Sequence, residues 1–163
     1  METDTLAAPP QLAPAPSPAA VPALIARLVE QHGAAWVDGH NIDDFLAESG
    51  DRVVFFAGDP VRFPECLDVA VVLPELQRVF AGRFQIGVAR REDEDALARR
   101  FGSQRWPALI FLRDGRYVTT VAGMLDWDVY LARVTEALAM APSRAPTIGI
   151  PVVGSGTAAP GCH

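Results

Sequence analysis

Apolar and polar residues follow two periods along the chain, which predict helices and strands in a regular order. Helical spacing of apolar residues predicts a short helix at 22–33 and further helices beginning near residues 41, 66 and 126. Continuous or alternating apolar runs predict strands at 35–37, 52–57, 84–89, 108–112 and 117–121. After the first helix the order is β-α-β-α-β-α-β-β-α. We therefore expect an α/β fold whose mixed sheet has helices on both faces.

Several residues are expected to fix the ends and the buried faces of these helices. Asn41 and Asp126 stand where a side chain can cap a helix, and Pro74 should kink the helix at 66–81. The four acids at 92–95 are interpreted as N-terminal charges of a helix that runs to Phe101. The residues expected to face the core are Leu67, Val71, Val72, Leu76, Val79 and Phe80 in the helix at 66–81, and Trp127, Tyr130, Leu131, Val134 and Leu138 in the last helix.

The chain divides into one domain with two ends of biased composition. Residues 1–21 are rich in Ala and Pro and predict a disordered arm. Residues 22–140 carry the predicted elements and suit a single core. Prolines and glycines recur from 141 to 163, which predicts a C-terminal tail that is disordered or lies on the surface.

Composition and charge narrow the classes of function. The net charge is −6 and all 14 basic residues are Arg, without a basic run, which argues against nucleic acid as a partner. No apolar run is long enough to span a bilayer and the first 20 residues do not read as an export signal, so we expect a cytoplasmic protein without direct membrane insertion.

The cysteines offer little for metal or disulfide chemistry. Cys66 and Cys162 lie far apart and form neither a CxxC pair nor, with the three histidines, a metal-binding spacing. A structural disulfide would not persist in a reducing cytosol. We therefore expect no metal ion and no other cofactor.

The stretch 101–123 carries a resemblance to thioredoxin. It contains Phe-Gly-x-x-x-x-Pro-x-Leu-x-Phe from Phe101 to Phe111, then an Asp-Gly hairpin turn and Gly123 before the final helix. Together with the order of the elements, this pattern resembles thioredoxin over roughly residues 34–140. A proline such as Pro107, at the first position of a strand, is often cis.

The same resemblance implies that the redox pair is broken. Aligning Pro74 with the kink proline of the thioredoxin active-site helix places Cys66 on the first catalytic cysteine and Val69 on the second. Val54 stands where thioredoxins carry a buried acid. A dithiol oxidoreductase needs a second thiol to resolve the mixed disulfide, and the alignment provides none.

A closer resemblance covers most of the domain. Phe55-Phe56-Ala57-Gly58-Asp59-Pro60-x-Arg62-x-Pro64-Glu65, then Glu75-Leu76, then Arg100-Phe101-Gly102-x-x-x-Trp106-Pro107-Ala108, is similar to the HyaE/HupG/HoxO group of thioredoxin-like hydrogenase accessory proteins. The resemblance implies a redox-inactive cytoplasmic chaperone for the small-subunit precursor of a membrane-bound NiFe hydrogenase. Its partner would be the twin-arginine signal peptide of that precursor, with other hydrogenase accessory proteins as further partners.

The expected contact surface surrounds the start of the helix at 66–81. Carboxylates there could receive the two arginines of a signal peptide, because Arg pairs bidentately with carboxylate. A solvated acidic face is the alternative interpretation, and Trp106-Pro107 could serve the fold alone or also bind a peptide by strand addition. The expected peptide-binding residues are Asp59, Glu65, Asp68, Glu75, Leu67, Val69, Trp106 and Pro107.

An enzymatic alternative rests on Cys66. A thiol at a helix N-terminus can have a lowered pKa and act as a monothiol oxidoreductase, with glutathione or Cys162 as the resolving partner. Glu65 and Asp68 would oppose this by raising the pKa. Direct handling of nickel, iron or an iron-sulfur cluster is a third idea, for which the chain offers few ligands.

Overall fold

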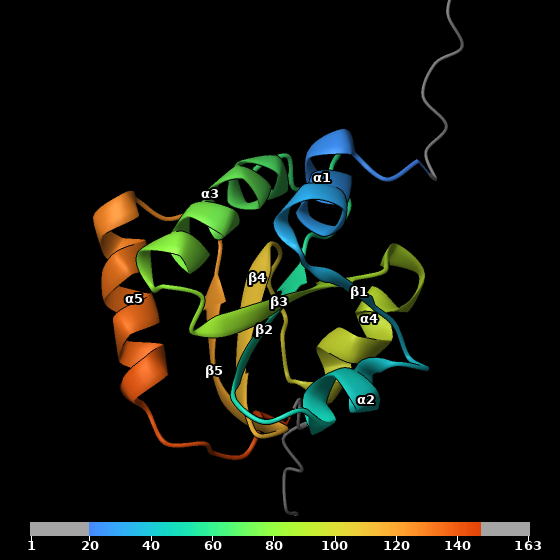
Figure 1. The fold of residues 1–163 in the computed structure, drawn as a ribbon. Helices are drawn as coiled ribbons and strands as arrows, with labels where there is room; N and C mark the ends of the chain where they lie inside the picture. The colour runs from blue at the N-terminus through green and yellow to red at the C-terminus, as the bar shows by residue number, and fades with distance from the viewer. Residues whose placement is uncertain (1–19, 148–163) are drawn as a thin grey trace, which may run out of the picture.

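The computed structural model describes residues 20–147, which form a five-stranded mixed sheet (Figure 1). The strands lie in the order β1-β3-β2-β4-β5. β3 pairs in parallel with β1 and β2, whereas β4 pairs antiparallel with β2 and β5. The strand bounds are β1 (Ala35–Val37), β2 (Asp51–Phe56), β3 (Phe84–Ala89), β4 (Ala108–Arg113) and β5 (Arg116–Ala122).

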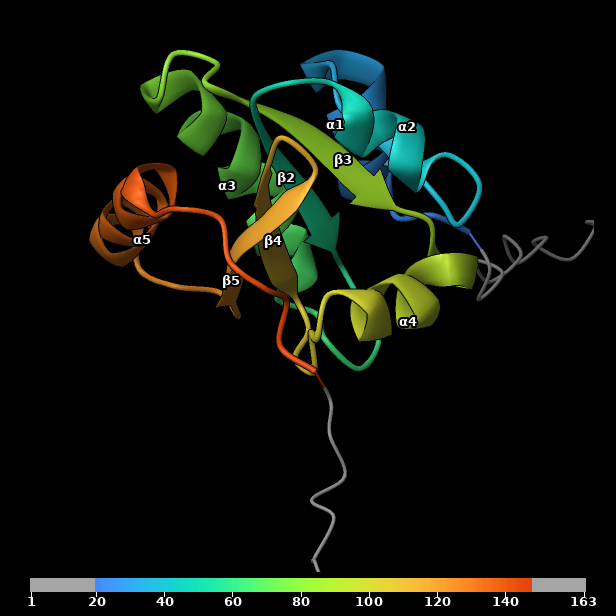
Figure 2. The same ribbon diagram turned by 90° about the horizontal axis from the view of Figure 1, so that it is seen from below.

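Helices cover both faces of this sheet, as Figures 1 and 2 show. α1, α3 and α5 lie over one face, and α2 and α4 lie over the other. The helix bounds are α1 (Ala23–His32), α2 (Ile42–Ala47), α3 (Cys66–Val79), α4 (Arg91–Arg100) and α5 (Trp127–Ala139). The expected thioredoxin-like α/β architecture, a mixed sheet with helices on both faces, is confirmed.

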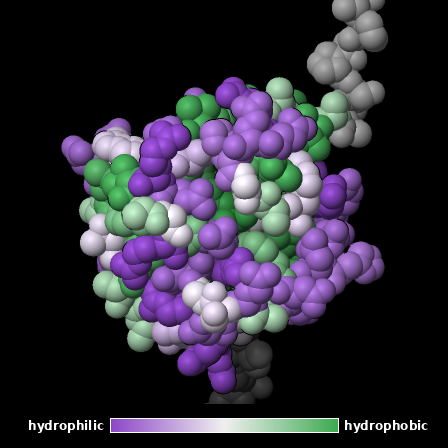
Figure 3. Space-filling model, viewed as in Figure 1, coloured by the Kyte–Doolittle hydropathy of each residue, from purple (hydrophilic) through white to green (hydrophobic). Residues whose placement is uncertain are grey.

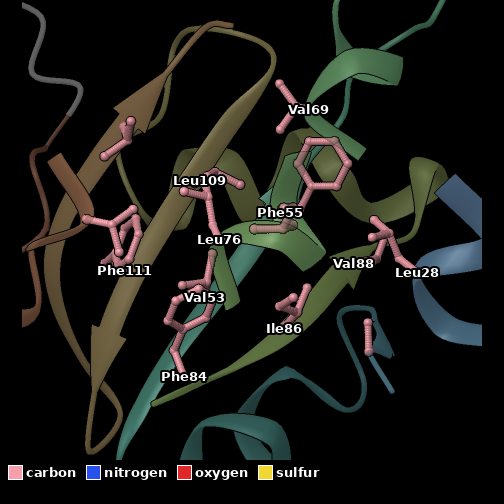
Figure 4. Close-up of a cluster of buried hydrophobic side chains, with 14 of the residues drawn as sticks. Leu28, Val53, Phe55, Val69, Leu76, Phe84, Ile86, Val88, Leu109 and Phe111 are labelled. Atoms are coloured by element: carbon pink, nitrogen blue, oxygen red, sulfur yellow. The ribbon is translucent and has the colours of Figure 1, made fainter. Parts of the chain in front are cut away.

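The core consists of two apolar layers separated by the sheet. Successive side chains of a strand point to opposite faces, so Val53 and Phe55 of β2 join the layer under α1, α3 and α5, whereas Val54 and Phe56 join the layer under α2 and α4. Figure 4 shows part of the first layer. All four side chains are fully buried, which explains why this strand is apolar along almost its whole length.

Two expected core faces were partly wrong. On α3, Val71 and Val79 are 55% and 56% exposed, while Leu73 packs into the core. The helix begins at Cys66, and its 3.6-residue period brings 66, 69, 70, 73 and 76 onto the inner face and carries 71 and 79 away from it. Trp127, at the start of α5, is 41% exposed. Hydrophobic residues accordingly appear on the surface over α3 and α5 (Figure 3).

Asn41 and Asp126 occupy the expected N-cap positions of α2 and α5, but neither side chain makes a capping bond. Asn41 precedes α2 but makes no capping bond; it instead accepts the backbone N–H of Asp38 at 2.8 Å and donates to the carbonyl oxygen of Trp36 at 2.8 Å. Asp38 holds the turn by accepting the backbone N–H groups of His40 and Asn41. Asp126 occupies the N-cap position of α5 without a side-chain capping bond.

The ends of the chain fall largely outside the described residues. Of the predicted arm only residues 20 and 21 are described, and of the predicted tail only residues 141–147. Within 20–147, no helix combines the length and the apolar character needed to cross a membrane.

Candidate functional site

Two loops at the carboxyl end of β2 meet around Trp106. The Trp106-Pro107 peptide bond is cis, and the Pro107 carbonyl oxygen accepts the backbone N–H of Gly123 at 2.7 Å. The Trp106 ring stacks on Phe63 from the loop between β2 and α3, with ring centroids 6.0 Å apart and an interplanar angle of 27°. The loop before β4 is thereby joined to the loop before α3.

Gly58 allows this close approach. Its φ is +76°, a conformation that L side chains rarely adopt. A Cβ at this position would lie 2.8 Å from a ring carbon of Phe63 and 2.9 Å from the Cβ of Trp106. A glycine is therefore required on both conformational and steric grounds.

A buried carboxyl group, Glu94 on α4, fixes the same loop from the other side. Its Oε1 accepts the backbone N–H of Gly58 at 2.6 Å, and the residue is 1% exposed. Burial raises the pKa of Glu94 to about 7, and the Gly58 N–H, Arg91 and the Trp106 indole partly oppose this shift. The indole Nε1 is itself buried and, within residues 20–147, has no hydrogen bond of acceptable geometry, so its effect on the Glu94 pKa reflects proximity.

The interpretation of residues 92–95 as helix charges was therefore incomplete. Glu92 and Asp95 are exposed, but Glu94 points into the fold. The sequence holds a weak signal for this difference, since Glu94 lies three and four residues before the buried Leu97 and Ala98 and thus shares their helix face.

Cys66 is placed where its thiol is unreactive. It is the first residue of α3 and is fully buried. Burial, together with the charges of Glu94, Glu65, Asp59 and Asp68, raises the pKa of its thiol to about 11. Because the thiolate is the nucleophile and the metal ligand, Cys66 is almost entirely protonated at neutral pH. Cys162 lies outside the described residues.

Metal ligands are not assembled in this part of the chain. Within residues 20–147, no group of three or more His, Cys, Asp or Glu side chains is arranged to hold a metal ion.

A pocket of about 400 Å³ opens beside Trp106, between α4 and the two loops. It is basic: Arg62, Arg91 and Arg99 line it against one acid, Asp95, which pairs with Arg91 at 3.5 Å. The complete lining is Gly58, Arg62, Phe63, Arg91, Asp95, Ala98, Arg99, Ser103, Gln104 and Trp106. Sequence reasoning missed this pocket because its arginines come from separate segments.

Of the expected peptide-binding residues, only Trp106 lines this pocket. Asp59, Glu65 and Asp68, hereafter the α3 acids, lie close enough to the start of α3 to act on the Cys66 thiol. Asp59 and Glu65 are half-buried and Asp68 is exposed.

The remaining expected residues lie elsewhere. Glu75 follows Glu65 by ten residues, about 15 Å along a helix, and pairs with Arg78 at 2.6 Å. Val69 is 1% exposed and belongs to the core, so its side chain is not available to a peptide. Leu67 is half-buried against the core, and Pro107 is buried.

Comparison with known proteins places the chain in a family. The family model "Hydrogenase-1 expression protein HyaE" matches residues 24–130. The chain is 65% identical over 154 residues to the hydrogenase expression/formation protein HoxO of Cupriavidus necator, covering 93% of this chain and 95% of that protein. It is 39% identical over 127 residues to HupG of Bradyrhizobium diazoefficiens, covering 76% and 86%.

The chain is also similar to a solved structure. The crystal structure of a HupG hydrogenase expression/formation protein from Rhodopseudomonas palustris is 43% identical, covers 64% of this chain and 95% of that chain, and superposes with a TM-score of 0.47. With the family model and the curated relatives agreeing over most of its length, this chain belongs to the HyaE/HoxO/HupG family of hydrogenase expression/formation proteins.

Proposed function

We propose that this chain is a redox-inactive chaperone that binds the small-subunit precursor of a NiFe hydrogenase through its twin-arginine signal peptide during maturation. One observation carries the proposal: in a chain of a hydrogenase expression/formation family, the position that aligns with the first catalytic cysteine of thioredoxin is inert. Cys66 is buried there with a thiol pKa of about 11, and Val69 stands where thioredoxin has its second cysteine. No observation favours the alternative of a monothiol oxidoreductase, because the thiol is neither accessible nor ionised at neutral pH.

The α3 acids are the proposed receptor for the two arginines. They lie together near the start of α3, and a guanidinium pairs bidentately with a carboxylate. The pocket beside Trp106 carries three arginines of its own and would repel the arginines of the peptide. We therefore assign the peptide arginines to the α3 acids, and leave Glu75 and Val69 out of the contact surface.

The apolar part of the peptide is assigned to Trp106 and Leu67. Both are only half-buried. Within residues 20–147, the main-chain N–H and C=O of Trp106 make no hydrogen bond. An extended peptide could therefore pair with this main chain by strand addition, while its side chains contact the indole.

Isothermal titration calorimetry with the signal peptide tests this proposal. We expect charge reversal by Glu65→Lys with Asp68→Lys to weaken binding about tenfold at low salt, which corresponds to about 1.4 kcal/mol for two ion pairs at the protein surface. The loss should shrink as salt is added, because exposed charges are screened.

The control is an equal charge reversal outside the proposed surface. Glu75 and Glu136 are exposed acids on α3 and α5, each paired with an arginine of its own helix. Glu75→Lys with Glu136→Lys should leave the affinity within about twofold of wild type. Equal losses in the two double variants would contradict the assignment to the α3 acids.

A further inference from the structure

The last described residues of the chain run back toward the pocket. After α5, residues 141–147 pass β5 and end beside the loop that follows α4 (Figure 2). The backbone N–H of Ser143 donates to the carbonyl oxygen of Tyr117 on β5 at 2.7 Å. This segment is thus held against the sheet rather than leaving the domain directly after α5.

The end of this segment, at Pro146, packs closely against Gly102. The carbonyl oxygen of Pro146 occupies the space in which a Cβ of residue 102 would lie, and Gly102 has a φ of +69°. Ser103 and Gln104, the next two residues, line the pocket. Pro146 therefore packs on a residue that lies one position along the chain from the first of these lining residues.

The surface of the pocket suits an uncharged, extended segment. The Phe63–Trp106 stack gives it an aromatic wall, and Ala98 adds apolar surface. Arginine guanidinium groups and the Gln104 amide supply N–H donors around it. Main-chain carbonyl groups of an extended segment could accept from these donors while its apolar side chains cover the aromatic rings.

The sequence after Thr147 has these properties. Residues 148–163 contain no Asp, Glu, Lys or Arg, so the pocket arginines meet no Lys or Arg that they would repel, and docking would bury no charged side chain of these types. Ile148, Ile150 and Val152 are spaced by two, which places them on one side of an extended chain. Pro151 favours an extended conformation at the residue before it and contributes a carbonyl group without an N–H.

Length and tethering make docking in the pocket feasible. Six extended residues reach about 20 Å, and the segment follows Pro146, which packs on Gly102, the residue before two lining residues. A short tether holds a segment at millimolar effective concentration, so even weak contacts suffice. We propose that residues 148–153 of this chain dock in the pocket, with Ile148, Ile150 and Val152 against the Phe63–Trp106 stack.

Paramagnetic line broadening in the full-length chain tests this docking. A nitroxide is attached at position 155 in a variant carrying Ser155→Cys and Cys162→Ser; Cys66 does not take the label because it is buried and protonated. We expect strong broadening of the Gln104 side-chain amide and the Trp106 indole N–H signals. The amides of α1, on the other face of the sheet, serve as the unaffected reference.

Two single substitutions separate docking from simple tethering. Ile150→Lys places a positive charge on the side proposed to face the pocket arginines and should reduce the broadening several-fold. Val153→Lys adds the same charge on the opposite side of the extended segment and should leave the broadening unchanged. Every other pattern overturns the proposal: no broadening beyond that of α1, broadening that survives Ile150→Lys, or loss with Val153→Lys.

Discussion

The buried carboxyl group of Glu94 should make the stability of the domain depend on pH in a defined direction. Its pKa is raised from 4.5 to about 7 in the folded chain, so between these values the folded state keeps a proton that the unfolded state has lost. The free energy of unfolding therefore falls as pH rises from about 4.5 to about 7, and levels off above. At 1.36 kcal/mol per pKa unit the full effect is about 3 kcal/mol.

Glu94→Gln removes this titration while keeping the shape of the side chain and an oxygen that can accept the Gly58 N–H. The other shifted groups lie outside the window: Cys66 and Tyr130 have pKa values of about 11 and about 12, and those of Asp38 and Asp43 are lowered. Urea unfolding followed by circular dichroism at pH 5 and pH 8 measures the difference.

We expect the wild-type chain to lose about 2 to 3 kcal/mol more than Glu94→Gln between these two pH values. Glu92→Gln, at an exposed acid two residues away on the same helix, should keep the wild-type pH dependence. The reasoning fails if wild type and Glu94→Gln lose stability equally between pH 5 and pH 8, or if Glu92→Gln removes the dependence as well.

Two further predictions concern the same corner of the fold. Gly58→Ala should lower the free energy of unfolding, measured in urea, by more than about 1 kcal/mol. The loss should exceed that of the control Gly33→Ala, because Gly33 has a similar φ of +70° but a Cβ there would meet nothing within 4 Å. Equal losses would mean that the close approach of Phe63 and Trp106 to Gly58 is unimportant. Cys66 should resist alkylation by iodoacetamide at pH 8 in the native chain and react only in urea, because its thiol is buried and protonated. Peptide mapping measures the alkylated fraction, and rapid alkylation of the native chain would contradict an inert thiol.

Sequence reasoning predicted correctly those parts of the fold in which a local pattern of residues is compatible with only one type of secondary structure. The apolar run from Val53 to Phe56 required a strand buried on both faces, and the proline before Ala108 required the start of a strand. Errors arose where the outcome depends on helix phase. The predicted start of α3 at Cys66 was right, but Val71 and Val79 are as apolar as Leu73, and the packing of α3 against the sheet decides which of them faces inward.

The candidate site was harder to predict for two physical reasons. Glu94 is one of four consecutive acids, and only its spacing to Leu97 separates it from its exposed neighbours. The pocket arginines Arg62 and Arg99 are 37 positions apart in the chain, and the fold alone brings them together. Sequence patterns find groups that are near one another along the chain, so the acids near α3 were noticed and the basic pocket was not.

The most direct test of the central claim is the affinity of this chain for the hydrogenase small subunit with and without its signal peptide, measured by calorimetry with wild type and Cys66→Ser. The account predicts tight binding of the precursor, loss of binding when the signal peptide is removed or its two arginines are changed to glutamine, and the same affinity for Cys66→Ser. Equal binding of the precursor and the subunit without its signal, or binding that requires Cys66, would contradict it.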